Sequence, residues 1–450
     1  MSVSIAARAL LYDRQAEAGL VGSVFRQDKK KGAVFIDRVT VPIHDYTSDR
    51  FERIRALDNA ENGSYLVQIS LPNGEVKTES FEITEGKDTK LAIDIPHEGP
   101  HEWSSLQAMT GQFASDALAD PTATAPPVTS GRYYVDLKDF PQQGFALRFL
   151  EMDDPLHTGA LIGKKAIPSL AKLIGEDVTI HEAGDCLGQG IEVLQPSQED
   201  PEFALFEFVR NGCLGDGADR ESYHFGPGTD LTRSYLLTFS GEGMSLICLP
   251  APWTRMGEEA DIQLLLDKRM LEPEPDFSMT ISDPMINSAL GYIRNGALHE
   301  AARLIDYSTA EGLLFNKISS PLAATIGGYL LLAGLDRAAY KSRSAEWKDW
   351  VDNLCGWFEW LPDGAVLKSA KYFVLGDNDR DEALTALMSA FERGLPFFSF
   401  GLNLMVEGMR RFANEGEERA KQRLPVLEAI SAVSDSAQDF LTIRVARRWT

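Results

Sequence analysis

The sequence predicts a multidomain α+β protein with an N-terminal β-sandwich, a β-rich middle domain and a C-terminal α-helical domain. Three observations support this prediction. Apolar and polar residues alternate in residues 1–96, a segment rich in proline, alanine and threonine follows, and from residue 282 the apolar period changes from two to about 3.6. At 450 residues the chain is also too long for one ordinary core, so we expect several domains.

Residues 1–96 are expected to form a small antiparallel β-sandwich. In "SYLVQISLPNGEVKTESFEI", strict alternation places four apolar side chains on one face: Tyr65, Val67, Ile69 and Leu71. Asn73-Gly74 then supplies the positive φ angles of a tight hairpin turn, after which the alternation resumes on a return strand.

Two segments separate this region from the helices. Residues 97–131 have the composition of a linker, as in "DPTATAPPVTSG", with room for one short helix around "WSSLQAMTGQF". Residues 132–281 contain strand-like runs such as "FALFEFV" and "RSYLLTFS", separated by glycine-rich turns such as "NGCLGDGAD". They are expected to form a β-rich middle region of one domain or two.

Residues 282–450 are expected to form an α-helical domain. Its first helix begins with an Asp283 cap and Pro284 in the first turn. A later helix ends at Gly394, with Pro396 blocking its continuation. Short connections between amphipathic helices predict a stacked arrangement of a degenerate, tetratricopeptide-like kind.

Charge and composition exclude several classes of function. A formal charge of −23 repels phosphate backbones, and we interpret the basic run at 29–31 as solvated charge, so no nucleic-acid partner is expected. The four cysteines form no CxxC pair and the first residues lack signal-peptide features, which predicts a reduced, cytoplasmic protein. The apolar run at 320–335 is about one turn too short to span a membrane, so the intact form should not bind one.

No cofactor and no metal site is predicted. "HEAGD" and "HEAAR" lack the second histidine of the zinc motif HExxH. "DNDRDE" spaces its aspartates like a calcium loop, but Glu382 stands where that loop needs glycine and Met388 where it needs a bidentate glutamate. These acidic residues are better explained as caps of the helix that follows.

Tryptophans are concentrated in "EWKDWVDNLCGWFEWLPDGAVLKSA". If residues 344–361 are helical, one stripe contains Trp347, Trp350, Leu354, Trp357 and Leu361. Such a stripe is mostly core, because it buries a large apolar area. Phe358 and Trp360 widen it beyond what one helix contact needs. We therefore expect an exposed remainder that binds a protein partner through Trp357, Phe358 and Trp360.

Three segments resemble a poorly described bacterial family: "SPLAATIGGYLLLAGL", "WVDNLCGWFEWLPDGAVL" and "EALTALMSAFERGLPFFSFGLNLMVEGMRRF". They share small-residue helices, a "WLPDGA" turn and a helix pair opened by "RGLP", and they lie within residues 320–412. Proteins similar to this family are often encoded beside caspase-like or CHAT-type peptidases in antiviral defence loci. The resemblance therefore implies a protein that acts with such a peptidase or is cleaved by it, and it implies no catalytic residues.

We interpret the chain as a non-enzymatic interaction scaffold, or as a substrate or regulator of a caspase-like peptidase. A peptidase that cuts after basic residues finds none between Lys90 and Arg132, so it would cut at Arg132 or near Arg220. A caspase-like enzyme would cut after Asp116, because Asp120 precedes a proline.

Two alternatives remain open. The first is a cysteine hydrolase with Cys213 as nucleophile, since His181 and His224 lie in the same block of sequence. The second is a latent membrane-active effector whose helix at 320–335 is released by proteolysis. Its glycine pair and its short length weigh against this reading.

Overall fold

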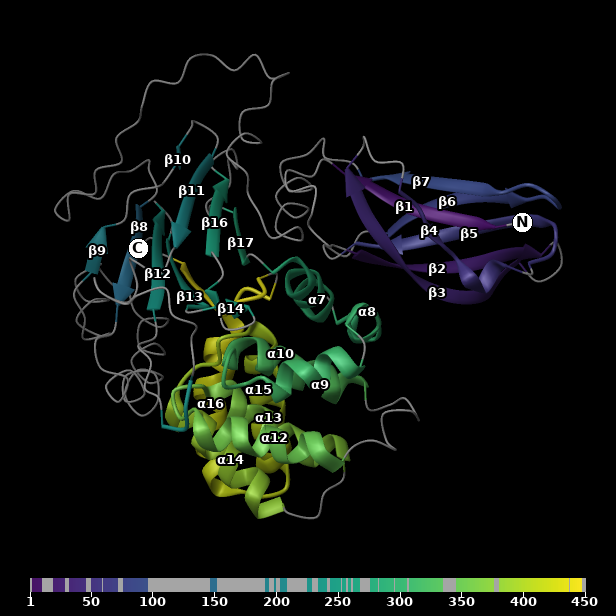
Figure 1. Ribbon diagram of the computed structural model, residues 1–450. Helices are drawn as coiled ribbons and strands as arrows, with labels where there is room; N and C mark the ends of the chain where they lie inside the picture. Colours follow the sequence, from purple (N-terminus) through teal and green to yellow (C-terminus); the bar gives the residue numbers. More distant parts are fainter. Residues whose placement is uncertain are drawn as a thin grey trace. The chain divides into compact units, whose positions relative to one another are not determined.

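In the computed structural model the chain forms two compact units (Figure 1). Unit 1 comprises Met1–Ala123 and Thr280–Asp306, and unit 2 comprises Thr124–Met279 and Tyr307–Thr450. The structure describes residues 2–9, 19–28, 32–45, 50–58, 60–71, 76–95, 146–151, 191–193, 198–199, 203–208, 225–228, 234–240, 243–251, 253–255, 258–259, 262–267, 276–281, 283–294, 296–305, 307–334, 345–375, 380–436 and 438–446.

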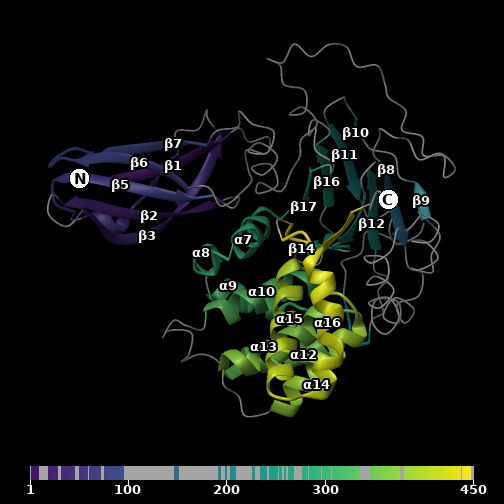
Figure 2. The same cartoon turned by 180° about the vertical axis from the view of Figure 1, so that it is seen from behind.

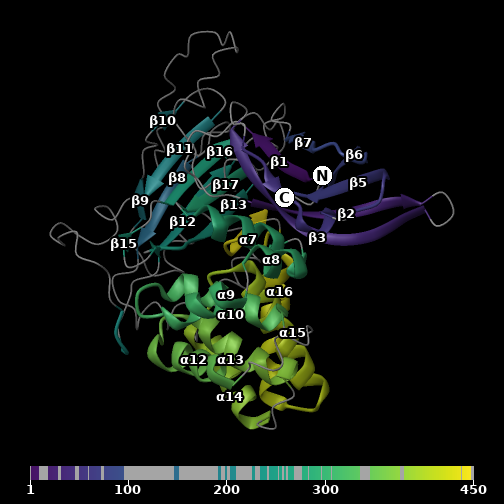
Figure 3. The same ribbon diagram turned by 45° about the vertical axis from the view of Figure 1, so that its right-hand side comes forward.

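The strands of unit 1 form a mixed β region in the order β4-β1-β3-β2-β5-β6, with β7 paired to β1 (Figure 3). Their bounds are Val3–Ala9 (β1), Gly19–Asp28 (β2), Gly32–Asp45 (β3), Glu52–Arg53 (β4), Gly63–Ser70 (β5), Val76–Ile83 (β6) and Thr89–Asp94 (β7). The prediction of an antiparallel sandwich was wrong in one respect, because β1 runs parallel to both β3 and β7. Alternation of apolar residues marks a strand but carries no information about the direction of a distant partner.

The alternation itself is confirmed. Tyr65, Val67, Ile69 and Leu71 are all buried in one apolar core, together with residues of the other strands. β5 and β6 pair antiparallel from Ser70 opposite Val76 onward, as expected for strands joined by a short turn. Asn73 and Gly74, which we expected in that turn, lie outside the described residues.

Among the described residues, unit 1 contains the helices α7 (Pro284–Arg294) and α8 (Leu298–Leu304). We had assigned them to the helical domain, but α7 packs against the β region through Tyr292. Its buried hydroxyl accepts a hydrogen bond from the Val21 N–H at 3.0 Å and donates one to the Ser70 carbonyl at 2.7 Å. Helical periodicity identifies a buried face, but it does not identify the element that covers that face.

Among the described residues, unit 2 contains three sheets, with the orders β10-β11-β16-β17, β18-β13-β12-β8-β9 and β14-β15, and only the last two residues of β17 fall in unit 1 (Figure 2). Their bounds are Ala146–Glu151 (β8), Ile191–Val193 (β9), Gln198–Glu199 (β10), Phe203–Phe208 (β11), Ser234–Ser240 (β12), Gly243–Leu249 (β13), Thr254–Arg255 (β14), Glu258–Glu259 (β15), Ile262–Asp267 (β16), Asp276–Ile281 (β17) and Thr442–Ala446 (β18). The sequence-based reading missed β18, which follows all the helices and pairs antiparallel with β13.

The remaining helices form a stacked region, which confirms that the C-terminal part is helical. Their bounds are Tyr307–Phe315 (α9), Pro321–Gly334 (α10), Ala345–Trp357 (α12), Pro362–Leu375 (α13), Arg380–Arg393 (α14), Ser399–Asn414 (α15) and Glu418–Ala432 (α16). The predicted stop of α14 is also confirmed, because Gly394 has a φ of 119°.

Helix α10 is enclosed by its neighbours, and its residues 321–332 are all buried. The glycine pair at its middle permits this position. A Cβ on Gly327 would lie 2.5 Å from the Ala310 carbonyl of α9, and one on Gly328 would lie 2.8 Å from the Leu367 side chain of α13. Within the described part of the chain, no helix is long and apolar enough to cross a bilayer.

Candidate arginine-lined pocket

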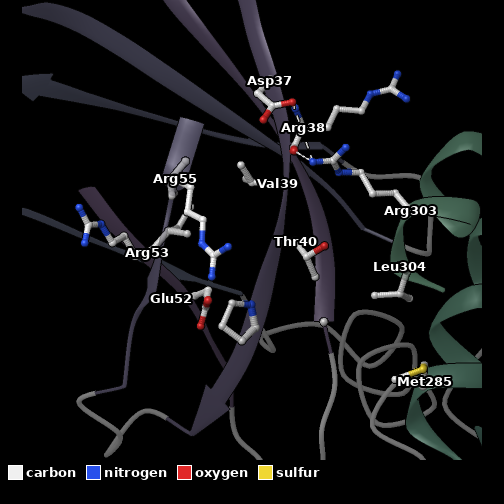
Figure 4. Close-up of a pocket in the computed structure, with 14 residues that line it drawn as sticks. Asp37, Arg38, Val39, Thr40, Glu52, Arg53, Arg55, Met285, Arg303 and Leu304 are labelled. Carbon is white, nitrogen blue, oxygen red and sulfur yellow. Dashed lines mark hydrogen bonds and ion pairs between the residues drawn. The ribbon is translucent and has the colours of Figure 1, made fainter. Parts of the chain in front are cut away.

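The candidate site is a pocket of about 510 Å³ in unit 1 (Figure 4). It lies where the sheet divides, because β1 pairs with β3 at Ala7–Ala9 and with β4 at Ser4–Ile5. Residues of β3 before that pairing form one wall, and residues from β4 and the end of α8 complete the lining. In Figure 4, Glu52 and Arg55 lie on one side of β3, and Arg303, Leu304 and Met285 lie on the other.

Four arginines and two carboxylates give the pocket its chemistry. The arginines come from β3, β4, the 3₁₀ turn η1 (Arg55–Leu57) and α8, and they are Arg38, Arg53, Arg55 and Arg303. The carboxylates are Asp37 and Glu52. Among the lining residues guanidinium groups therefore outnumber carboxylates, and two of them have carboxylate partners, Glu300 and Asp58, outside the lining.

Three of these arginines are held by partners. The guanidinium of Arg303 donates a hydrogen bond to the carbonyl of Arg38 and lies 3.9 Å from the Asp37 carboxylate. The Arg38 side chain in turn lies 3.3 Å from Glu300 on α8. Arg53 pairs with Asp58 at 2.9 Å. These contacts fix the positions of the charged groups around the cavity.

Arg55 differs, because within the described part of the chain its side chain forms no ion pair and no hydrogen bond. Its backbone is nevertheless well anchored. The neighbouring Ile54 is buried and donates a hydrogen bond from its N–H to the Val3 carbonyl at 2.8 Å, and Leu57 at the end of η1 is fully buried. The turn therefore presents an exposed, uncompensated guanidinium from a rigid base.

This arrangement can bind an acidic group. Guanidinium groups bind carboxylates and phosphates through paired, charge-assisted hydrogen bonds. The sequence-based reading missed the site, since Arg38, Arg55 and Arg303 lie far apart in the chain and form no local basic run. The basic run that the sequence does show, at 29–31, lies outside the described residues.

The predicted partner-binding residues have a different environment from the one expected. Helix α12 ends at Trp357, so Phe358 and Trp360 lie in the turn before α13. Phe358 is fully buried and Trp360 is 7% exposed, with its ring 5.8 Å from that of Phe397. The expectation of an exposed remainder around Trp360 was therefore wrong. The helix ends four residues earlier than assumed, and the turn folds these rings inward.

Trp350 and Trp357 remain half-buried and contact a lysine. The ammonium of Lys317 lies 5.9 Å from the centroid of the Trp350 ring and 5.2 Å from that of Trp357. Trp347 is fully buried, so the stripe is largely core, as its length indicated.

A buried carboxylate in the "WLPDGA" turn also escaped the sequence-based reading. Asp363 accepts a 2.6 Å hydrogen bond from the hydroxyl of Tyr329 and a 2.7 Å hydrogen bond from the N–H of Phe397. Burial, followed by the nearby Asp363 charge, holds the pKa of Tyr329 well above its ordinary range. Because Asp363 joins α10, α13 and the segment before α15, we assign it a structural role.

Several candidate residues cannot be placed. Cys213, His181 and His224 of the hydrolase alternative lie outside the described residues, and so do the candidate cleavage positions Asp116, Arg132 and Arg220. The described cysteines, Cys248 and Cys355, are both buried. Among the residues that the structure describes, no group of three or more histidine, cysteine, aspartate or glutamate side chains could hold a metal ion.

The fold and the pocket together define a multidomain α+β protein with a basic pocket in its β unit. Residues 288–444 match the family described as the Y4kD C-terminal domain. This stretch contains the three segments on which the resemblance rested, so the helical part is similar to a known family. That description mentions no peptidase and no genomic neighbourhood. Neither a curated protein nor a solved structure matches the chain.

Proposed function

We propose that the chain is a non-enzymatic protein-interaction scaffold whose arginine-lined pocket binds an acidic segment of a protein partner. The observation that carries this proposal is the uncompensated guanidinium of Arg55 in a pocket where arginines outnumber carboxylates. The anchored turn fixes the backbone of Arg55, so binding orders only its side chain and breaks no existing ion pair.

The residues that line the pocket suit a peptide ligand better than a nucleotide. Apolar side chains such as Val39, Ile54 and Leu304 lie among the arginines, which suits the mixed surface of a polypeptide. Among the described residues that line the pocket, none is an aromatic residue that would stack on a base.

Binding of a fluorescein-labelled hexaglutamate peptide to the full-length chain tests the proposal. We expect Arg55→Ala to weaken binding about tenfold, the effect of losing one charge-assisted hydrogen-bonding group. Arg419→Ala is the matched control, because Arg419 is exposed on α16 and changes the net charge equally. Equal effects of the two variants would mean that only net charge matters, and the pocket would be rejected as the binding site.

The peptidase relationship is a second part of the proposal and rests on the family resemblance. In it, the partner is a caspase-like or CHAT peptidase of a cytoplasmic antiviral system, and the helices provide a tetratricopeptide-like scaffold. Co-incubation with such a peptidase, followed by mass spectrometry of the new termini, tests whether the chain is also its substrate. Cleavage after Asp116 is expected for a caspase-like enzyme, and at Arg132 or Arg220 for one that cuts after basic residues. An intact chain would count against the substrate role.

A further inference from the structure

We propose that the acidic partner binds as an added β-strand along the free edge of β3, next to the pocket. This inference rests on the proposed function, since it specifies the conformation of the same partner. Over Gly32–Pro42, β3 pairs with β2, and the described residues offer no strand for its other edge. A strand with an unpaired edge presents N–H and C=O groups that an extended peptide can satisfy.

The free edge carries apolar side chains where a protected edge would carry charges. Val34, Phe35 and Ile36 are consecutive and exposed, and Phe35 is 52% exposed. At the far side of the same strand order, β6 carries the exposed charges Glu79 and Glu82, which discourage pairing. The contrast indicates that β3 is the edge adapted to a partner.

Two features of the β2–β3 hairpin lie beside the exposed residues of β3. β5 accompanies β2 only as far as Arg26, so the β2–β3 hairpin projects past it (Figure 3). The register between β2 and β3 also shifts at Val24/Phe25, which leaves Ile36 as the extra residue of a bulge. The ring of Phe35 then rests against that of Phe25 at 5.7 Å in an edge-to-face contact.

The free edge leads directly into the pocket. Immediately after Ile36, β3 supplies Asp37, Arg38, Val39 and Thr40 to the lining. The backbone carbonyl of Arg38 already accepts a hydrogen bond from the Arg303 side chain, so strand pairing should end at this residue. A peptide paired with Gly32–Ile36 would then place its next residues among the arginines (Figure 4).

Charge complementarity selects the occupant. The partner should contain a short apolar, strand-forming stretch next to several acidic residues. A second copy of this chain fits less well, because the edge segment that it would offer, Gly32–Ile36, contains no acidic residue for the arginines.

Two synthetic peptides test the inference on the full-length chain. The first alternates valine and threonine over six residues and ends in four glutamates, and it is also made with the glutamates first. The second is the same peptide with every backbone amide of the valine–threonine half N-methylated, which removes the strand hydrogen-bond donors on both edges and keeps every side chain. We expect the first peptide, in one of its two orders, to bind at least about tenfold more tightly than hexaglutamate, and N-methylation to abolish that gain.

Substitutions on the two sheet edges provide the matching protein test. Phe35→Lys should abolish the gain as N-methylation does, because it places a charge on the paired edge. Val76→Lys is the control and should leave binding unchanged, since Val76 is 55% exposed on β6, three strands from β3 in the strand order. Circular dichroism should show that both variants fold.

The outcomes separate this inference from the proposed function. Equal binding of the methylated and unmethylated peptides would overturn strand addition, while Arg55-dependent binding of hexaglutamate would leave the pocket intact. A concentration-dependent dimer in sedimentation velocity that Phe35→Lys dissociates would also overturn the inference, because the edge would then belong to a second copy. If hexaglutamate did not bind the wild-type chain, the proposed function itself would be rejected.

Discussion

The ammonium group of Lys317 lies 5.2 Å from the centroid of the Trp357 ring, and the lysine side chain is almost entirely buried, with 4% of the residue exposed. Each ring contributes a cation–π attraction of about 0.5–2 kcal/mol, depending on how fully the cation is desolvated. Burial acts in the opposite direction and lowers the pKa of Lys317. Desolvation of the ammonium group therefore opposes the attraction of the two rings.

Replacing Lys317 by methionine should therefore stabilise the protein at neutral pH. Methionine has a similar length and packs against the same rings without a buried charge. Because the folded-state pKa of Lys317 lies below the unfolded value, the unfolded chain binds more protons between the two values, and the free energy of unfolding of the wild type rises with pH there. The gain in free energy of unfolding from Lys317→Met should thus be largest at neutral pH, and it should shrink as the pH approaches the ordinary lysine pKa of 10.5.

Urea denaturation of both proteins at a series of pH values measures this difference. Lys421→Met on the exposed face of α16 is the control, and its effect should not change with pH in the same way. A constant difference between wild type and Lys317→Met across the series would contradict the assignment.

Gly401→Ala should destabilise the helical region by roughly 1–3 kcal/mol. A Cβ at this position would lie 2.5 Å from the Asp363 carboxylate and 2.6 Å from the Tyr329 hydroxyl, two groups already fixed by their mutual hydrogen bond. Gly312→Ala in α9 is the matched control, since a Cβ there meets nothing within 4 Å and should stabilise the helix by about 0.5–1 kcal/mol. If the packing is as described, thermal unfolding should show a lower melting temperature for Gly401→Ala and a higher one for Gly312→Ala.

Tyr292→Phe should reduce the free energy of unfolding by about 1–3 kcal/mol, because it leaves the Val21 N–H and the Ser70 carbonyl without their shared hydroxyl. Tyr372→Phe is the comparison. Within the described part of the chain the Tyr372 hydroxyl forms no hydrogen bond, so Tyr372→Phe should change the free energy of unfolding by no more than about 0.5 kcal/mol. Hydrogen exchange at Val21 should also become faster in Tyr292→Phe, and unchanged exchange there would argue against the bridge.

Trp360→Ala should behave as a core substitution and cost about 3–5 kcal/mol. Its ring packs edge-to-face against both Phe358 and Phe397, and alanine would leave a cavity between them. Val374→Ser, at an exposed position on α13, should have little effect on the melting temperature. If Trp360→Ala melted like the wild type, the burial of this ring would be wrong.

Local sequence patterns predicted the structural features that depend on residues close together in the chain. Alternation identified the buried face of β5, and the Asp283-Pro284 pair marked the start of α7, where the Asp283 carboxylate accepts a 3.5 Å hydrogen bond from the Ile286 N–H. The stop at Gly394 belongs to the same kind of signal. In each case a few consecutive residues contain the physical cause.

Features that depend on distant residues could not be predicted in this way. The parallel partners of β1, the attachment of α7 to β2 and the four-arginine pocket all join positions widely separated in sequence. The end of α12 is an intermediate case. Pro362 starts the next helix, and a turn of four residues between them was enough to bury Trp360, which the assumption of one long helix had left outside.

The pairing of β18 with β13 has a consequence for how the protein can be divided. Leu246 lies opposite Ile443, so the entire run of helices from α9 to α16 is an insertion between two adjacent strands of one sheet. A fragment that starts after β17 would therefore separate β18 from its neighbour and expose the newly freed edge to other chains. Fragments for expression should keep β13 together with the helices, or end before Thr442.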